Sequence, residues 1–387
     1  MTNPILETHK SGTSNTILVS HSWPPGNSNS ILASHAGDYP GGGGGSFAIT
    51  SVSLSGTELT INGAQFGTKA GPAPYFFRSW VGASAGLTWQ QAGYTQYRTD
   101  KWEGAARTVT GEGIGGASAM KITCRQADPD TDADAVFTHP QLFMPASTQG
   151  LFFSQWMRFD CLGTVNNRPQ IKGPRSGPFS GTPSDEGGNY ATNPHMSASL
   201  FTNFNWDTSD DSDVQAEYSS PISGDGEEHS YAQGNPPPVG FGENAYFNWE
   251  GRYVFNDVGV ANGIMEHYIN GKIQAPKYDC QNRASSGQYL DFFSPHPGFE
   301  NMSAANDRDW DIYFSRPYVD TGPDMLARVF LGNSATLGSC TGRFLCPPTV
   351  WGSTQIKVSD VENVPTGYDW VYVVKSDGTI SNGYQWR

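Results

Sequence analysis

The chain has 387 residues, of which 46 are glycine, 26 are proline and 13% are aromatic. This composition is typical of short strands joined by many turns, and it excludes a coiled coil or a doubly wound α/β protein. The 37 acidic and 23 basic residues give a formal net charge of −14, which excludes a general affinity for nucleic acid or anionic lipid. No run reaches the roughly 18 apolar residues of a membrane-spanning helix, so none is predicted.

The N-terminal segment contains a threefold repeat. The pattern N-x-I-L-x-[ST]-H occurs at 3–9, 15–21 and 29–35, and five consecutive glycines follow at 41–45. A segment so poor in apolar residues does not bury a core of its own, so we expect an extended arm over 1–46 that ends in a flexible linker. We interpret the repeats as three weak docking sites for a partner with several equivalent pockets. The predicted contact residues are Ile5, Leu6, His9, Ile17, Leu18, His21, Ile31, Leu32 and His35.

Two alternatives for the arm stay open. The first is a low-complexity duplication without a function. The second is a metal site formed by His9, His21 and His35. Zinc ligands need a fixed geometry that an arm without a scaffold does not supply, so docking is the favoured interpretation.

A small β-domain is predicted from both ends of the chain. Residues 47–67 alternate in polarity around Ser55-Gly56, which predicts a β-hairpin. This stretch, with Gly63-x-x-Phe66-Gly67, resembles the opening of immunoglobulin-like IPT/TIG domains. Alternating segments also occur at 354–359 and 369–378. We therefore expect 47–72 and 321–387 to pair into one split Ig-like β-sandwich, because domain insertion at a surface loop is structurally cheap.

The central region, 73–320, is predicted to be a single large β-domain. Its clearest alternating segments are 151–160, 245–255, 264–269 and 310–315. The stretch from Trp249 to Lys272 resembles concanavalin A-like jelly rolls, in particular the branch shared by laminin-G-type lectins and polysaccharide lyases. Tyr268 stands where that family usually has tryptophan. The predicted fold class is all-β: a concanavalin A-like jelly roll inserted into, or following, the small Ig-like sandwich.

This resemblance implies that sugars lie on a concave sheet face, against aromatic and polar side chains. Trp156 and Trp249 are expected in the core, since about half of a strand's residues face inward. His267 and Glu217 are further polar residues considered for this face. The predicted carbohydrate-binding residues are Arg158, Gln170, Lys172, Trp206, Tyr218 and Arg252.

Catalysis is not predicted, and no catalytic residue is assigned. The segment Gln170-Ile-Lys172 is similar to the Q-I-H strand of alginate lyases, but Lys172 replaces the histidine that the family uses. A lyase needs a base of this kind to remove the proton next to the uronate carboxylate. The paired carboxylates of jelly-roll glycoside hydrolases, in the pattern E-x-D-x-x-E, do not occur. A secreted lyase or glycoside hydrolase of jelly-roll fold is retained as the alternative function.

The cysteines and acidic runs suggest no cofactor. Cys340 and Cys346 are close enough in sequence to form a disulfide, whereas Cys124, Cys161 and Cys280 are interpreted as buried thiols. The acidic run at 128–134 could hold a structural Ca²⁺, but it lacks the glycine and glutamate of an EF-hand loop, and a solvated loop is favoured. The run at 210–213 is interpreted in the same way.

Together these features predict a bacteriophage virion surface protein. No secretory signal is recognised, and because the sequence begins with Met1 we expect release by another route, such as lysis. The arm would bind capsid or tail proteins of a symmetric assembly, and the jelly roll would bind glycans of the host surface. A homo-oligomer is expected. Binding to nucleic acid and insertion into a membrane are not expected. An extracellular location is the alternative.

Overall fold

The computed structural model describes residues 47–94, 96–97, 106–124, 135–137, 140–162, 170–178, 196–201, 213–219, 228–233, 244–273, 276–281, 283, 285–295, 298–300 and 309–387. These residues belong to one compact unit. They form antiparallel strands almost throughout, with two short 3₁₀ turns, η1 (Ile114–Gly116) and η2 (Leu337–Ser339), so the predicted all-β fold class is confirmed. None of the helices in this described part has the length and apolar character needed to cross a membrane.

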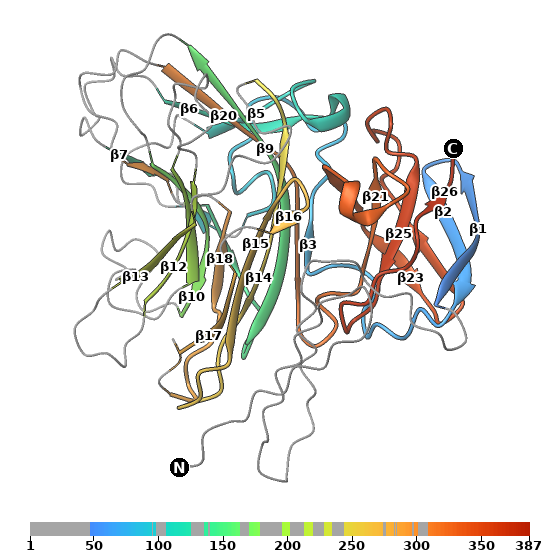
Figure 1. Ribbon diagram of the computed structural model, residues 1–387. Helices are drawn as coiled ribbons and strands as arrows, with labels where there is room; N and C mark the ends of the chain where they lie inside the picture. The colour runs from blue at the N-terminus through green and yellow to red at the C-terminus, as the bar shows by residue number, and fades with distance from the viewer. Residues whose placement is uncertain are drawn as a thin grey trace, which may run out of the picture. The chain divides into compact units, whose positions relative to one another are not determined.

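Two large antiparallel sheets form the central sandwich (Figure 1). The first, here called the β9 sheet, contains β3 (Phe76–Phe77), β5 (Ala106–Val109), β6 (Ala119–Cys124), β9 (Gly150–Leu162), β14 (Phe247–Val254), β15 (Gly263–Ile269), β16 (Lys272–Ile273), β17 (Lys277–Cys280) and β20 (Asp309–Thr321). The second, the β10 sheet, contains β4 (Gln96–Tyr97), β7 (Ala135–Phe137), β8 (Pro140–Phe143), β10 (Gln170–Gly177), β11 (Met196–Phe201), β12 (Asp213–Ser219), β13 (Glu228–Gln233), β18 (Phe292–Ser294) and β19 (Gly298–Glu300).

The large core lies between these two sheets. Along β9, Leu151, Phe153, Met157 and Phe159 are buried in it, together with Gln155, whose amide donates to the backbone carbonyl of Pro295 at 3.1 Å. The even-numbered residues from Phe152 to Arg158 face the other side of the sheet. This is the period of two expected for a strand with one face in a core. The β10 sheet contributes Phe293 among others. Burial of each large apolar side chain contributes about 1.5–3 kcal/mol.

A smaller sandwich combines the two ends of the described chain (Figure 1). One of its sheets, the β2 sheet, has the order β1-β2-β24-β23, and the other, the β21 sheet, has the order β22-β21-β25-β26. β2 pairs with β24 through Leu59 with Val358 and Ile61 with Ile356, and all four side chains are buried. The Ig-like assignment of this sandwich stays a prediction. Its strands are β1 (Ala48–Ser55), β2 (Glu58–Ala64), β21 (Arg328–Gly332), β22 (Arg343–Cys346), β23 (Pro348–Trp351), β24 (Gln355–Val358), β25 (Trp370–Val374) and β26 (Tyr384–Gln385).

The small sandwich packs against the outer face of the β9 sheet. The ring centroids of Trp156 and Tyr368 are 6.1 Å apart, and the guanidinium of Arg328 lies 4.1 Å from the ring centroid of Phe152. Lys69 forms a buried ion pair with Asp320 at the same junction. Trp156 is therefore buried, as expected, but at the junction between the two sandwiches and not inside the large core.

The predicted disulfide between Cys340 and Cys346 is not formed, and both are free thiols. The reason is that the two side chains belong to different apolar clusters. Cys346 lies between the sheets of the small sandwich with Val329, whereas Cys340 lies on the other side of the β21 sheet with Phe330. Burial raises the pKa of Cys346 to about 12, so this thiol stays neutral at ordinary pH.

Candidate functional site

The outer face of the β10 sheet can be assigned from its backbone register. Ser176 pairs with Phe293, which lies in the large core, and Phe293 pairs with the core residue Leu142. Residues that pair directly across antiparallel strands share a face, and neighbours along a strand alternate between faces. Arg175, next to Ser176, therefore belongs to the outer face, opposite the core.

Two cross-strand rows on this outer face consist almost entirely of polar positions. One row runs through Arg175, Ser197, Glu217 and Ser230, on β10, β11, β12 and β13. The next row runs through Lys172, Ser199, Gln215 and Ala232 on the same strands. We call these two rows the polar face.

The opposite face has a different character. Its rows place Ile171 beside Leu200 and Val214, and Met196 beside Tyr218. Apolar and polar positions therefore alternate from row to row, which is the ordinary sequence pattern of a sheet with one buried side. Because neighbouring strands lie about 4.8 Å apart, the backbone places the positions of the polar face at regular intervals.

One end of the polar face is sheltered. Ser294 on β18 pairs with Arg175 and so extends the first row, yet its side chain is 0% exposed. Its hydroxyl has no hydrogen-bond partner among the residues that the structure describes. A buried hydroxyl without a hydrogen-bond partner is energetically costly.

The predicted carbohydrate-binding residues do not share one face. Gln170 and Lys172 lie at outer-face positions of β10, because Gln170 pairs with Phe201 and Lys172 with Ser199. Tyr218 lies in a core-face row, beside Met196, which the alternation of β12 explains. Trp206, the acidic run at 128–134, the run at 210–212 and the nine predicted docking residues of the arm lie outside the described residues.

Arg158 and Arg252 are on the other large sheet, apart from Gln170 and Lys172, and their role in carbohydrate binding stays a prediction. Both occupy the outer face of the β9 sheet, on β9 and β14. Nη1 of Arg252 lies 4.0 Å from Oε2 of Glu266 on the neighbouring strand β15. The two arginines alternate with core residues as the sequence indicates, but the sequence did not reveal which of two sheets each strand would join.

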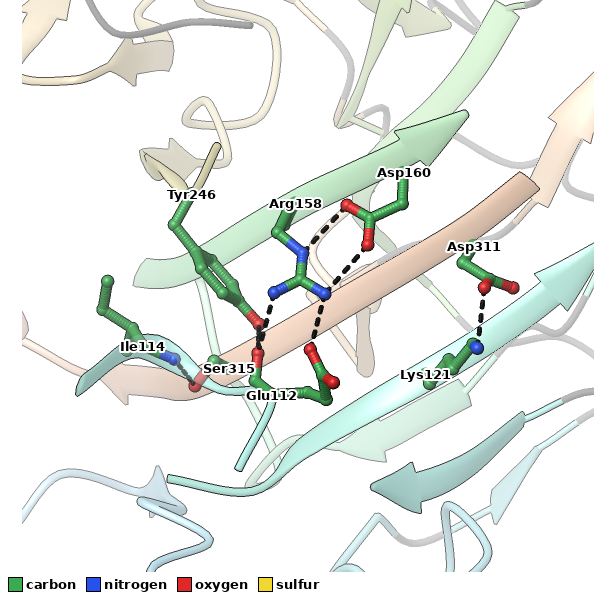
Figure 2. Close-up of polar contacts among 8 residues, drawn as sticks. All are labelled: Glu112, Ile114, Lys121, Arg158, Asp160, Tyr246, Asp311 and Ser315. Atoms are coloured by element: carbon green, nitrogen blue, oxygen red, sulfur yellow. Dashed lines mark hydrogen bonds and ion pairs between the residues drawn. The ribbon is translucent and has the colours of Figure 1, made fainter. Parts of the chain in front are cut away.

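Arg158 is the centre of a polar cluster that sequence reasoning missed (Figure 2). Its guanidinium donates to both carboxylate oxygens of Asp160, at 2.9 Å each, and to Oε2 of Glu112 at 2.8 Å. The Tyr246 hydroxyl donates to the backbone carbonyl of Glu112 at 2.6 Å. The guanidinium also lies 3.9 Å from the ring centroid of Tyr313. We call these five residues the Arg158 cluster.

The electrostatics of the Arg158 cluster favour its charged form. Burial alone would lower the pKa of Arg158, but its hydrogen bonds to Glu112 and Asp160 raise that pKa above the ordinary value. Burial raises the pKa of Tyr246, so this hydroxyl remains protonated and able to donate. A second ion pair, Lys121 with Asp311 at 2.6 Å, lies beside the cluster on the same face (Figure 2).

The Arg158 cluster fixes the turn at 112–117 onto the β9 sheet. The backbone N–H of Ile114 donates to the Ser315 hydroxyl at 3.2 Å, and the Ile114 side chain packs against the core of the small sandwich. Glu112, two residues earlier, is held by Arg158 and Tyr246. The guanidinium is occupied by these partners, so we assign the cluster a structural role in joining the sandwiches.

His267 is inside the large core, where it cannot contact a solvent-borne ligand. The indole N–H of Trp249 donates to its Nδ1 at 3.2 Å, which places the imidazole proton on Nε2, 3.4 Å from the Tyr253 hydroxyl. Burial lowers the pKa of His267 to about 3, so the ring is neutral. The signal was present in the sequence, because His267 lies two residues from both Met265 and Ile269, which face the core.

Metal ligation finds no support in the part of the chain that the structure describes. No three side chains of histidine, cysteine, aspartate or glutamate come together there. The run at 128–134, for which a structural Ca²⁺ is the alternative to a solvated loop, lies outside that part.

Comparison with known proteins gives structural similarity alone. No protein-family model matches the chain, and no curated protein matches it. An alginate lyase from Aplysia kurodai is similar over 64% of this chain and 99% of its own, at 14% identity and a TM-score of 0.46. A glucuronan lyase from Trichoderma reesei is similar over 64% of this chain and 96% of its own, at 11% identity and a TM-score of 0.41. The receptor-binding domain of botulinum neurotoxin type G is similar over 78% of this chain and 68% of its own, at 9% identity and a TM-score of 0.34. None of these similarities identifies a function for this chain.

Proposed function

We propose that this protein binds a glycan along the polar face of the β10 sheet. The observation that carries the proposal is the pair of rows headed by Lys172 and Arg175, which line up lysine, arginine, glutamine, glutamate and serine positions across four neighbouring strands. A glycan presents hydroxyl, carboxyl or amide groups at short intervals. A flat array of donors and acceptors at strand spacing is suited to meet them.

The end of the polar face at Ser294 favours the interpretation of this face as a ligand site and not as an ordinary solvated surface. A polar outer face is common in antiparallel sheets and does not by itself imply binding. Ser294 differs, because its buried hydroxyl has no described partner at the position where the Arg175 row ends. Because Ser294 is 0% exposed, a ligand would have to displace the atoms that cover it before a ligand hydroxyl or carboxylate could supply the missing hydrogen bond.

A substitution series tests the proposal. Lys172→Ala and Gln215→Ala should each weaken glycan binding, by about 1.5–3 kcal/mol for a hydrogen bond to a charged group and less for a neutral one. Arg252→Ala is the matched control, because it removes a cation from the other large sheet. Binding would be measured on a glycan array and by titration calorimetry with the best glycan. Equal losses in the Lys172→Ala and Arg252→Ala variants would contradict the proposal.

Lyase activity is the alternative proposal for the same face. Gln170 and Lys172 occupy neighbouring outer-face positions of β10, and a lysine with a suitably lowered pKa can act as a general base. Incubation with uronate-containing polysaccharides and detection of unsaturated products separates the alternatives. Product formation that Lys172→Ala abolishes would establish the lyase, whereas binding without product supports the glycan-binding protein.

The location on a virion stays a prediction, and it rests on the repeats of the arm. Its test is independent of the polar face. Deletion of residues 1–40 should abolish incorporation into particles and leave glycan binding unchanged. Incorporation that persists without the arm would contradict it.

A further inference from the structure

The edge strand β1 is an unusual border for a sheet. Within the part of the chain that the structure describes, β1 pairs with β2 alone, so one side of its backbone has no strand partner (Figure 1). Its eight residues, Ala48–Ser55, include neither a proline nor a charged side chain, and Leu54 is 52% exposed. Natural sheets ordinarily protect such edges with charges, prolines or a cover, because a bare edge accepts strands from other molecules. β26, at the border of the other small sheet, lies close to β1 but does not pair with it.

The opposite border of the same sheet shows that protection. β23 begins with Pro348, which has no N–H to offer, and Pro347 precedes it. A register shift between Pro348 and Val350 further interrupts the pairing of β23 with β24. β1 has a register shift as well, between Ile49 and Ser51, but from Ser51 to Ser55 its ladder with β2 is regular. This regular half of β1 is the part open to an additional strand.

The repeats of the arm have the length and character of such a strand. Each repeat has seven residues, as β2 has, and the copies at 15–21 and 29–35 contain no acidic, lysine or arginine residue. Their adjacent Ile and Leu would point to opposite sides of an added strand. One of them would then lie beside Val52 and Leu54, which are on the core side of β1 because they pair with the core residues Ile61 and Leu59.

We propose that the repeats of one copy add as strands to the β1 edge of other copies, so that the chain assembles with itself. A chain has three repeats and one β1 edge, so the edge of each copy has several candidate strands from neighbouring copies. Backbone hydrogen bonds of the added strand would supply affinity, and the Ile-Leu pair would supply register. This inference does not depend on glycan binding and extends beyond it.

The test is the oligomeric state of the full chain, measured by light scattering and sedimentation across a concentration series. We expect concentration-dependent association of the unaltered chain. Replacement of Ile5, Leu6, Ile17, Leu18, Ile31 and Leu32 by serine, which removes the apolar pair from all three repeats, should weaken association at least about tenfold, because no repeat then keeps the pair that sets its register. The same loss is expected for Ser53→Lys on the β1 edge.

Control variants keep the outcome decisive. Thr349→Lys places the same charge on the opposite border of the sheet, at another exposed position, and should leave association unchanged. A synthetic peptide of residues 14–22 should bind the chain that lacks residues 1–40, and the Ser53→Lys change should abolish that binding. A full chain that stays monomeric at high concentration would overturn the proposal. So would association that Ser53→Lys does not affect.

Discussion

The Arg343 guanidinium donates to the Glu250 carboxylate at 2.9 Å, and this ion pair joins the small sandwich to the outer face of the β9 sheet. Glu250 is 0% exposed, and Arg343 also donates to the backbone carbonyl of Gly271 at 3.3 Å. Arg328, buried nearby, has its pKa lowered by burial and partly restored by the charge of Glu250. One carboxylate therefore serves two buried cations.

Loss of this carboxylate should strongly destabilise the protein. Glu250→Ala leaves Arg343 buried without its counter-ion, a change that costs about 3–5 kcal/mol in comparable pairs. Glu58→Ala is the matched control, because its pair with Lys357 is solvent-exposed and should be worth about 0–1 kcal/mol. Urea unfolding of both variants measures the difference. Similar shifts in the two midpoints would show that the buried pair does not hold the junction.

His267 should make stability depend on pH between about pH 6.5 and about pH 3. Its folded-state pKa of about 3 lies below the ordinary value near 6.5, so the unfolded chain binds a proton that the folded chain excludes. Stability is therefore full above about pH 6.5 and falls with decreasing pH, by at most about 1.4 kcal/mol per pH unit from this residue.

The measurement is the urea midpoint at several pH values for the unaltered chain and for His267→Gln. Glutamine retains an acceptor for the Trp249 indole but does not titrate. The variant should be less stable at pH 7 and should lose less stability on acidification. Parallel pH profiles for the two proteins would show that the imidazole is not the titrating group.

The turn at 112–117 should loosen when Arg158 is replaced by methionine. The variant loses the hydrogen bonds to Glu112 and Asp160, each worth about 1.5–3 kcal/mol when a charged group is involved. Faster amide hydrogen exchange at Ile114 and its neighbours would report this local opening. Arg387→Met, which breaks a surface pair with Asp369, should leave that exchange unchanged.

Reducing agents should not alter the thermal stability of the protein. Cys280, Cys340 and Cys346, the cysteines whose side chains the structure describes, are free and buried, so none of them offers a bond for a reductant to cleave. The melting temperature should be the same with and without dithiothreitol, and native Cys346 should be unreactive toward thiol reagents because its pKa is about 12. A melting temperature that is lower in the presence of the reductant would contradict this expectation and support the predicted disulfide.

The sequence was a good guide to strands and a poor one to their partners. Period-two alternation identified β9 and β15 correctly, since the physical cause of the pattern, one face in a core, is local. The choice of sheet is a long-range property, and for that reason Arg158 and Arg252 were expected beside Lys172 although they lie on another sheet. The Arg158 cluster combines Glu112, from a turn, with Tyr246, which directly precedes β14. No spacing in the sequence indicates that these two residues meet.

The pairing of β2 with β24 also sets the order in which the protein can fold during synthesis. Lys357 and its partner Glu58 are 299 positions apart, so the first hairpin leaves the ribosome long before the strands that cover it exist. Until then its apolar side, with Leu59 and Ile61, is exposed to solvent. The central β-domain emerges in between and has its own core. Closure of the small sandwich must therefore be among the last steps, and a ribosome that stalls before residue 355 would release a chain with an uncovered hairpin, prone to aggregation.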